Sequence, residues 1–134
     1  MSWDLTAIRQ ELADVGAALG YTPWPFVPND IQQMPAIVVG VPTEIVYGRT
    51  FQGGSATITL PVTIVVDWGS AEDAEQRLNA AVSSGTPGSL FDAYQARVGV
   101  NFKNVNPGTA RDWRKATAGE STALAVDLIL TVIA

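Results

Sequence analysis

Few residues of this chain have the types and spacing that catalysis needs. The densest group of carboxylates is Glu72, Asp73 and Glu75, and carboxylates act as an acid and base pair when a cleft separates their pKa values. These three fall in the first turn of a predicted helix, where the helix dipole favours acidic side chains. Lys103 and Lys115 fall in polar segments that do not favour a Ser–Lys nucleophile, and no histidine is present to act as a base. The sequence therefore predicts a protein that is not an enzyme.

The residues that usually hold metals and cofactors are also scarce. The chain has no cysteine and no histidine, which removes thiolate and imidazole ligands. The glycine-containing segments GRTFQGG and NPGT match neither a Walker loop nor a dinucleotide fingerprint, so we interpret them as turns. Aspartate and asparagine are not spaced as in a calcium loop. We expect no metal and no cofactor.

Residue types common at protein interfaces gather near the C-terminus. Residues 106–120 are predicted to be a polar, glycine-containing loop, and Arg and Trp side chains are enriched where protein surfaces are buried together. The segment Lys103 to Lys115 holds four of the eight basic residues and forms either a partner contact or a solvated surface. The candidate contact residues here are Lys103, Arg111, Trp113, Arg114 and Lys115.

A second candidate contact is the tip of a predicted hairpin. Residues 44–51 and 55–68 are expected to pair around Gln52-Gly53-Gly54, a sequence suited to a tight turn. Arg49 and Phe51 would then lie at the tip. Unless the tip folds back onto its own sheet, it would reach a neighbouring subunit.

Charge is unevenly distributed along the chain. Residues 1–96 hold three basic and ten acidic side chains, a balance of −7, and residues 97–134 hold five basic and three acidic, a balance of +2. The overall −5 disfavours non-specific nucleic-acid binding, which needs a basic face. The reversal either lets one copy meet the acidic part of another or is ordinary scatter.

Periodicity predicts the elements that position these residues. Residues 4–19 repeat apolar side chains at helical spacing, with Arg9, Glu11 and Asp14 expected off the apolar stripe. Four prolines then predict an extended segment, and residues 36–41 predict a strand apolar on both faces. Residues 55–68 alternate with period two, and Pro61 among them suggests an edge position or a bulge.

The second half of the chain predicts two helices and two strands. A helix begins at Ser70, and a shorter one follows Ser89 and runs through Val98. Strands are predicted over residues 98–105 and 121–133. The order is α-β-β-β-α-α-β-β in a single domain over residues 1–134. We expect an α+β, two-layer fold with a mostly antiparallel sheet, helices on one face and a long hairpin. Threonines on the other face remain available for contacts.

Neither end of the chain suggests a membrane segment. The N-terminal residues lack the basic start and apolar centre of a signal peptide. The most apolar stretch, residues 122–134, is too short to span a bilayer and contains Asp127. We expect a soluble protein that is made in the cytoplasm and does not contact membranes.

Several segments form a recognisable layout: the amphipathic first helix, MPAIVVGVP at 34–42, VTIVVDWGSAEDAEQRLN at 62–79, SLFDAY at 89–94 and the apolar last strand. Together they resemble, over nearly the whole chain, the tail terminator proteins of long-tailed, siphovirus-type bacteriophages. The resemblance implies a non-enzymatic virion protein in the tail and neck, assembled in the cytoplasm of the bacterial host.

The resemblance also implies partners. Such proteins form a homo-hexameric ring that caps the tail tube protein, ends tail polymerisation and meets the head-side connector or head-closure protein. DNA passes through the lumen without specific binding. One alternative is another neck component, such as a head-closure or adaptor protein, or a tail tube subunit, although three helices count against a tube barrel. A more distant alternative is a small-ligand-binding domain with a pocket of Trp24, Phe26 and Tyr94.

Overall fold

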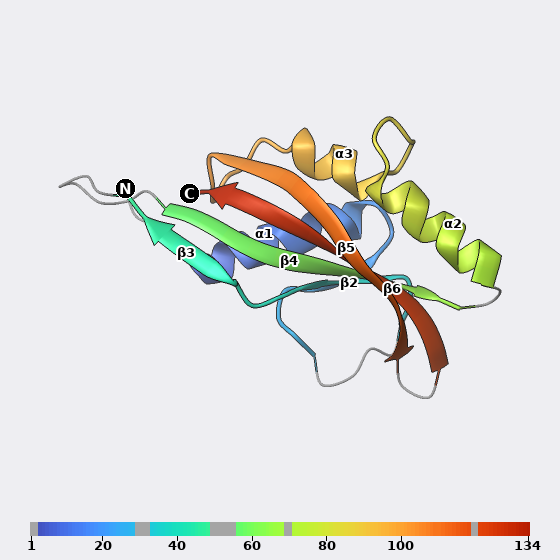
Figure 1. Ribbon diagram of the computed structural model, residues 1–134. Coiled ribbons are helices and arrows are strands. Elements are labelled where there is room, and N and C mark those ends of the chain that lie inside the picture. Colours follow the sequence, from blue (N-terminus) through green and yellow to red (C-terminus); the bar gives the residue numbers. More distant parts are fainter. Residues whose placement is uncertain (1–2, 29–32, 49–55, 69–70, 119–120) are drawn as a thin grey trace.

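The computed structural model describes residues 3–28, 33–48, 56–68, 71–118 and 121–134. They form a mixed, mostly antiparallel six-stranded sheet with the order β1-β2-β4-β6-β5, and β3 pairs with β4 beside β2 (Figure 1). The elements in chain order are α1 (Leu5–Ala18), β1 (Thr22–Trp24), β2 (Ala36–Val39), β3 (Glu44–Tyr47), β4 (Ala56–Asp67), α2 (Ala71–Val82), α3 (Leu90–Gln95), β5 (Asn104–Ala118) and β6 (Ser121–Ile133). The expected α+β class is confirmed.

Helix α1 begins and ends as its sequence predicts. The Asp4 carboxylate accepts a hydrogen bond from the Thr6 amide at 2.9 Å and caps the N-terminus. Gly20, just beyond the helix, has a φ of +94°, which glycine adopts without steric cost. Ile8, Leu12 and Val15 are buried against the sheet.

Strands β4 and β6 form the centre of the sheet. They pair over eleven positions, from Thr57 opposite Ile133 to Asp67 opposite Ala123. Alternate residues of both strands are buried in one continuous core beneath the helices, as the period-two pattern predicts. These core residues are Ile58, Leu60, Val62, Ile64, Val66, Leu124, Val126, Leu128, Leu130 and Val132.

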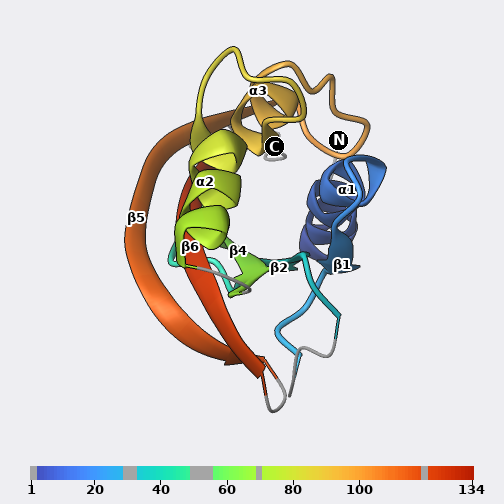
Figure 2. The ribbon, with the colours of Figure 1, turned by 90° about the vertical axis from the view of Figure 1, so that its right-hand side faces the viewer.

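The helices α1, α2 and α3 all contribute to that core. Leu12 of α1, Leu78 of α2 and Tyr94 of α3 are each fully buried within it. Figure 2 shows the helices together on the concave side of the curved sheet. In the described part of the chain, no helix has the length and apolar character needed to cross a membrane.

Pro61 does not mark an edge strand, so the prediction of an edge or a bulge is wrong. The register of β4 with β6 is continuous through Pro61, which lies opposite Ile129. Its carbonyl accepts a hydrogen bond from the Gly40 amide, on the side of β4 where β2 has ended and β3 has not yet begun. Because a residue's N–H and C=O point to the same side of a strand, the missing donor of proline falls at this gap.

The predicted strand is wrong over residues 98–103, and the predicted loop is wrong over residues 106–118; residues 119–120 lie outside the described residues. Residues before Asn104 are irregular, and β5 runs over Asn104–Ala118 in antiparallel pairing with β6. Two register shifts, between Pro107 and Thr109 and between Arg111 and Arg114, each insert one extra residue. Each insertion reverses the alternation of side chains, so the strand shows no period-two signal in sequence.

The structure also tests the predictions for the proline-containing segment, the end of α3 and the hairpin. The proline-containing segment includes a short strand, β1, parallel to β2, and α3 ends at Gln95 rather than extending to Val98. Strands β3 and β4 pair from Glu44 opposite Thr59 to Tyr47 opposite Ala56, as the hairpin prediction requires. The tip with Arg49 and Phe51 lies outside the described residues.

Candidate functional site

The second register shift of β5 creates a bulge that presents interface-type side chains. Asp112 within it has a φ of +64°, a left-handed conformation that costs free energy in a residue with a side chain. The Asp112 carbonyl accepts a hydrogen bond from Arg114 Nη1 at 2.8 Å, which ties the bulge together. Trp113 beside it is 47% exposed, and Arg111 is also exposed. The bulge thus fixes a tryptophan and an arginine on the outer strand of the sheet.

Arg114 has an intramolecular role as well. Its Nη2 donates to Asp127 Oδ1 at 3.2 Å, and the Thr63 hydroxyl donates to the same oxygen at 2.7 Å. Thr63, Asp127 and Arg114 come from the three adjacent strands β4, β6 and β5 on the face without helices. They join these strands through side chains.

The five sequence candidates near the C-terminus do not form one cluster. The Lys115 ammonium lies 4.7 Å from the centre of the Trp68 ring, a cation–π contact near the start of α2. Lys103 precedes β5, whose first residue pairs with Ile133, whereas Lys115 pairs with Leu124. Nine residues of strand separate these two partners, about 30 Å at ~3.3 Å per residue. The structure therefore groups Arg111, Trp113, Arg114 and Lys115 and separates Lys103 from them.

Glu11 is the main site residue that sequence reasoning missed. Its side chain is only 5% exposed, so the expectation that it lies off the buried stripe is wrong. It follows Ile8 by three residues and precedes Val15 by four, and this spacing already places it on the buried face. A carboxylate can be buried there because it is satisfied by donors from the connection between α3 and β5.

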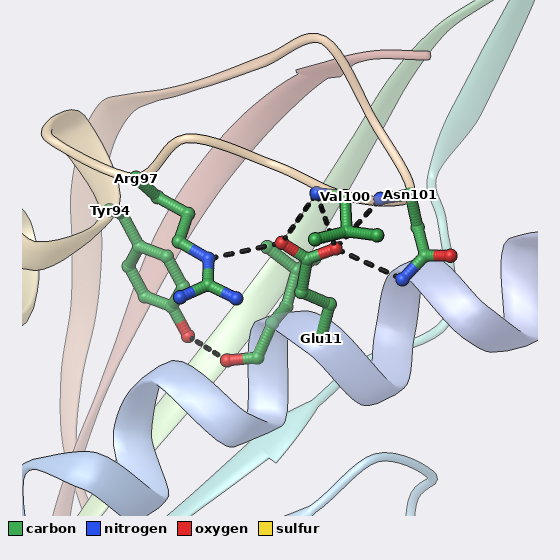
Figure 3. Close-up of polar contacts among 6 residues, drawn as sticks. Glu11, Tyr94, Arg97, Val100 and Asn101 are labelled. Atoms are coloured by element: carbon green, nitrogen blue, oxygen red, sulfur yellow. Dashed lines mark hydrogen bonds and ion pairs between the residues drawn. The ribbon is translucent and has the colours of Figure 1, made fainter.

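Four groups donate to the Glu11 carboxylate (Figure 3). Oε2 accepts from Arg97 Nε at 3.0 Å, and Oε1 accepts from the Asn101 backbone amide at 2.9 Å and from Asn101 Nδ2 at 3.0 Å. The Val100 amide donates to both oxygens, at 3.1 and 3.2 Å. Because the backbone amides of Val100 and Asn101 donate their hydrogen bonds to this carboxylate, they are not available to pair with a neighbouring strand. This explains why residues 98–103 of the predicted strand are irregular and pairing begins only at Asn104.

The hydrogen bonds to Glu11 also determine its protonation. Burial by itself raises the pKa of this carboxyl, but the donors from Val100, Asn101 and Arg97 together outweigh it. The pKa of Glu11 therefore lies below its ordinary value, and the group is ionised at neutral pH.

The loop bound to Glu11 exposes two apolar side chains. Val98 is 86% exposed and Val100 is 87% exposed. Between them, a Cβ at Gly99 would lie 2.4 Å from the buried Phe102 ring, so only glycine fits this close turn. Two valines held outward on a fixed backbone can be buried against a partner with little loss of conformational entropy.

A further exposed group lies beside α1 and β1, at the end of the sheet opposite β5. Phe26, which follows β1, is 49% exposed, and the Arg9 guanidinium lies 5.0 Å from its ring centre. Arg9 Nη2 donates to the Val39 carbonyl at 2.8 Å, which orients the guanidinium. Val27, which follows Phe26, is exposed as well, and Asp14 is exposed on α1.

The carboxylates that could have suggested catalysis are solvent-facing. Glu72 and Asp73 occupy the exposed first turn of α2. Among the described residues, no three histidine, cysteine, aspartate or glutamate side chains lie together as metal ligands would. Comparison with models of known protein families gave no match, and a search of curated proteins gave none either.

Proposed function

We propose that this chain is a structural virion protein of a long-tailed bacteriophage, a tail terminator that forms a homo-oligomeric, hexameric ring. The ring caps the tail tube, ends its polymerisation and joins the tail to the head-side connector. DNA passes through its lumen without being bound specifically. The protein assembles in the bacterial cytoplasm and resides in the tail and neck of the particle.

One observation carries the proposal: interface-type side chains are exposed on backbone that is held in place. Trp113 lies in the second β5 bulge, which the hydrogen bond from Arg114 to the Asp112 carbonyl holds together. Val98 and Val100 lie in the loop that donates to the buried Glu11 carboxylate. Such preorganised apolar and aromatic groups are typical of surfaces that become buried in assemblies. The resemblance described above supplies the kind of assembly.

The arrangement of the sheet favours a terminator over a tail tube subunit. A tube subunit would close its sheet into a barrel, whereas this strand order runs from β1 to β5 as an open path with three helices on one face. The ligand-binding alternative loses one of its three pocket residues. Tyr94 is fully buried in the core, where its hydroxyl donates to the Leu12 carbonyl at 2.8 Å.

Tail assembly in vitro tests the proposal. The purified chain is expected to form rings in negative-stain images and to stop elongation when added to polymerising tail tube protein of the same phage. Omitting the chain should give overlong tubes that do not join heads. Rings that neither bind tube ends nor limit tube length would overturn the terminator assignment.

Charge reversal at the bulge tests the role of the basic residues. Arg111→Glu is the informative substitution, because Arg111 pairs only with its exposed neighbour Asp112 at 3.6 Å among the described residues, whereas Arg114 and Lys115 contact Asp127 and Trp68 and their reversal would disturb the fold. We expect Arg111→Glu to lower the yield of joined particles, with Arg77→Glu on the exposed side of α2 as a matched control. Normal particle yield from the Arg111 variant would remove the bulge from the contact surface.

A further inference from the structure

We infer that the two ends of the sheet are the two halves of one head-to-tail contact between copies of this chain. The β5 bulge of one copy, with Arg111 and Trp113, docks on the α1/β1 end of the next copy, with Asp14, Phe26 and Val27. This inference rests on the proposed ring and names the surfaces that build it.

The β5 half is suited to contacts through side chains and not to strand pairing. Strand β5 is the last strand of the sheet path, so its outer edge lacks a neighbour in the described residues. Two bulges, Pro107 and three basic residues lie along it, and these are the features by which proteins prevent edge-to-edge pairing. What this edge offers a partner is therefore an exposed indole beside a guanidinium.

The α1/β1 half offers complementary chemistry. Phe26 and Val27 provide exposed apolar area, and the contact between Arg9 and Phe26 holds the ring in one place. Asp14 on α1 is exposed and accepts only a 3.0 Å hydrogen bond from its neighbour Gln10 among the contacts of the described residues. An indole can pack on the apolar pair while an arginine meets the carboxylate.

Charge distinguishes this pairing from contact between like ends. Strand β5 holds three basic side chains and one acidic side chain, a balance of +2, and Arg111 is paired with the exposed Asp112 at 3.6 Å. Helix α1 with its cap Asp4 exposes two acidic side chains, Asp4 and Asp14, because Glu11 is buried and paired with Arg97. Its one basic side chain, Arg9, is partly buried, so the balance at this surface is −1. Two β5 edges would repel each other, whereas a β5 edge attracts an α1/β1 end.

The position of the two ends determines what such a contact builds. Strands β1 and β5 terminate opposite ends of the path β1-β2-β4-β6-β5, and Figure 2 shows β5 and α1 on opposite sides of the molecule. A contact between different surfaces leaves one free end of each kind, so copies continue to add, and a ring forms when the rotation between successive copies closes. The partner that fits each end is therefore a second copy of this chain.

Two variants that each disable one end test the inference. Variant A carries Arg111→Glu and Trp113→Ala, and variant B carries Asp14→Arg, Phe26→Ser and Val27→Ser. By native mass spectrometry, wild-type protein should form oligomers and each variant alone should be monomeric. A mixture of A and B has one intact β5 end and one intact α1/β1 end, so it should yield A–B heterodimers and nothing larger.

A charge exchange and a control complete the experiment. A single chain with both Asp14→Arg and Arg111→Glu should recover at least part of the wild-type assembly, because the reversed charges again attract. Arg77→Glu makes the same charge change on α2 and should leave assembly unchanged.

The inference and the proposed function can fail separately. If variants A and B assemble as the wild type does, or if their mixture gives no heterodimer, the surfaces named here are wrong while rings and tube capping stand. Wild-type chain that is monomeric at every concentration also overturns the inference, and the tube-length experiment then decides the function alone. If oligomers behave as expected but tubes are not capped, the contact stands and the terminator role falls.

Discussion

Glu11 is the residue on which most of the functional surface depends. A buried carboxylate is costly to desolvate, and it persists here because four groups donate to it. The result is a bond between the first helix and a loop that lies almost ninety residues later in the chain. That bond holds Val98 and Val100 in the orientation that exposes them.

We expect Glu11→Gln to destabilise the fold by about 2–4 kcal/mol, because an amide nitrogen would face backbone donors that the carboxylate now accepts. Urea unfolding followed by circular dichroism measures the change. Asp14→Asn, which alters an exposed carboxylate of the same helix, should change stability by about 0.5 kcal/mol or less. Equal effects of the two substitutions would show that the Glu11 contacts contribute nothing net.

The lowered pKa of Glu11 predicts how stability depends on pH. In the unfolded chain this carboxyl has its ordinary pKa, so the folded state binds the proton less readily and gains stability above that value. The contribution is complete at neutral pH and is lost as pH falls through the folded-state pKa. The difference in unfolding free energy between wild type and Glu11→Gln should therefore shrink as pH falls below about 5. Urea unfolding at each pH measures this difference. A difference that stays constant down to the acid range would contradict the assignment.

At the scale of elements, α1 is held very close to β2. A Cβ at Gly16 would lie 2.0 Å from Ile37 Cδ1, and both residues are buried. No side chain larger than hydrogen fits at this crossing unless the helix moves or Ile37 changes rotamer. The position of α1 over the sheet, and with it the position of Glu11, therefore depends on this glycine.

Gly16→Ala should destabilise the protein by about 1–3 kcal/mol despite the higher helix propensity of alanine. Adding Ile37→Val removes the clashing Cδ1 atom, so the double variant should lose less stability than the sum of the single variants. Thermal and urea unfolding provide both values. Gly108→Ala is the control, since a Cβ there meets only the Ile129 carbonyl at 3.9 Å. Additive losses at Gly16 and Ile37 would argue against direct contact.

At the scale of the whole molecule, the sheet has ends of different character. The β5 edge is basic and carries Trp113, and the α1/β1 end is acidic and carries Phe26. The −5 net charge of the chain hides this division, because the acidic side chains are concentrated before residue 97. Opposed ends of opposite charge suit repeated addition of copies in one direction.

Self-association of the wild-type chain should therefore weaken as salt is raised. Solvent-exposed charges are screened over about 10 Å at 0.1 M salt and about 3 Å at 1 M, so the attraction between ends decreases while apolar contacts persist. Sedimentation velocity at 50 mM and 500 mM NaCl should show a shift toward smaller species. Arg77→Glu should show the same salt response as the wild type, and Arg111→Glu should show little. Salt-independent association would exclude charge as the basis of pairing.

The sequence by itself determined α1, β4, β6 and the beginnings of α2 and α3. These elements bury one regular face, so burial leaves a period of 3.6 or 2 in the residues, and caps such as Asp4 and Ser89 add local signals. The α+β class follows from the same patterns. Each of these signals comes from neighbours along the chain.

Only the tertiary structure decided the nature of β5, the place of Pro61 in a central strand and the use of Glu11. Strand β5 has two bulges and little covered area, so its pairing with β6 leaves no periodic trace. Pro61 is tolerated because, beside it, β2 has ended and β3 has not yet begun. Glu11 is satisfied by donors from residues 97–101, and their distance along the chain hides the match from any local pattern. Contacts between distant segments determine these features, and two of them, β5 and the Glu11 contacts, form the candidate site.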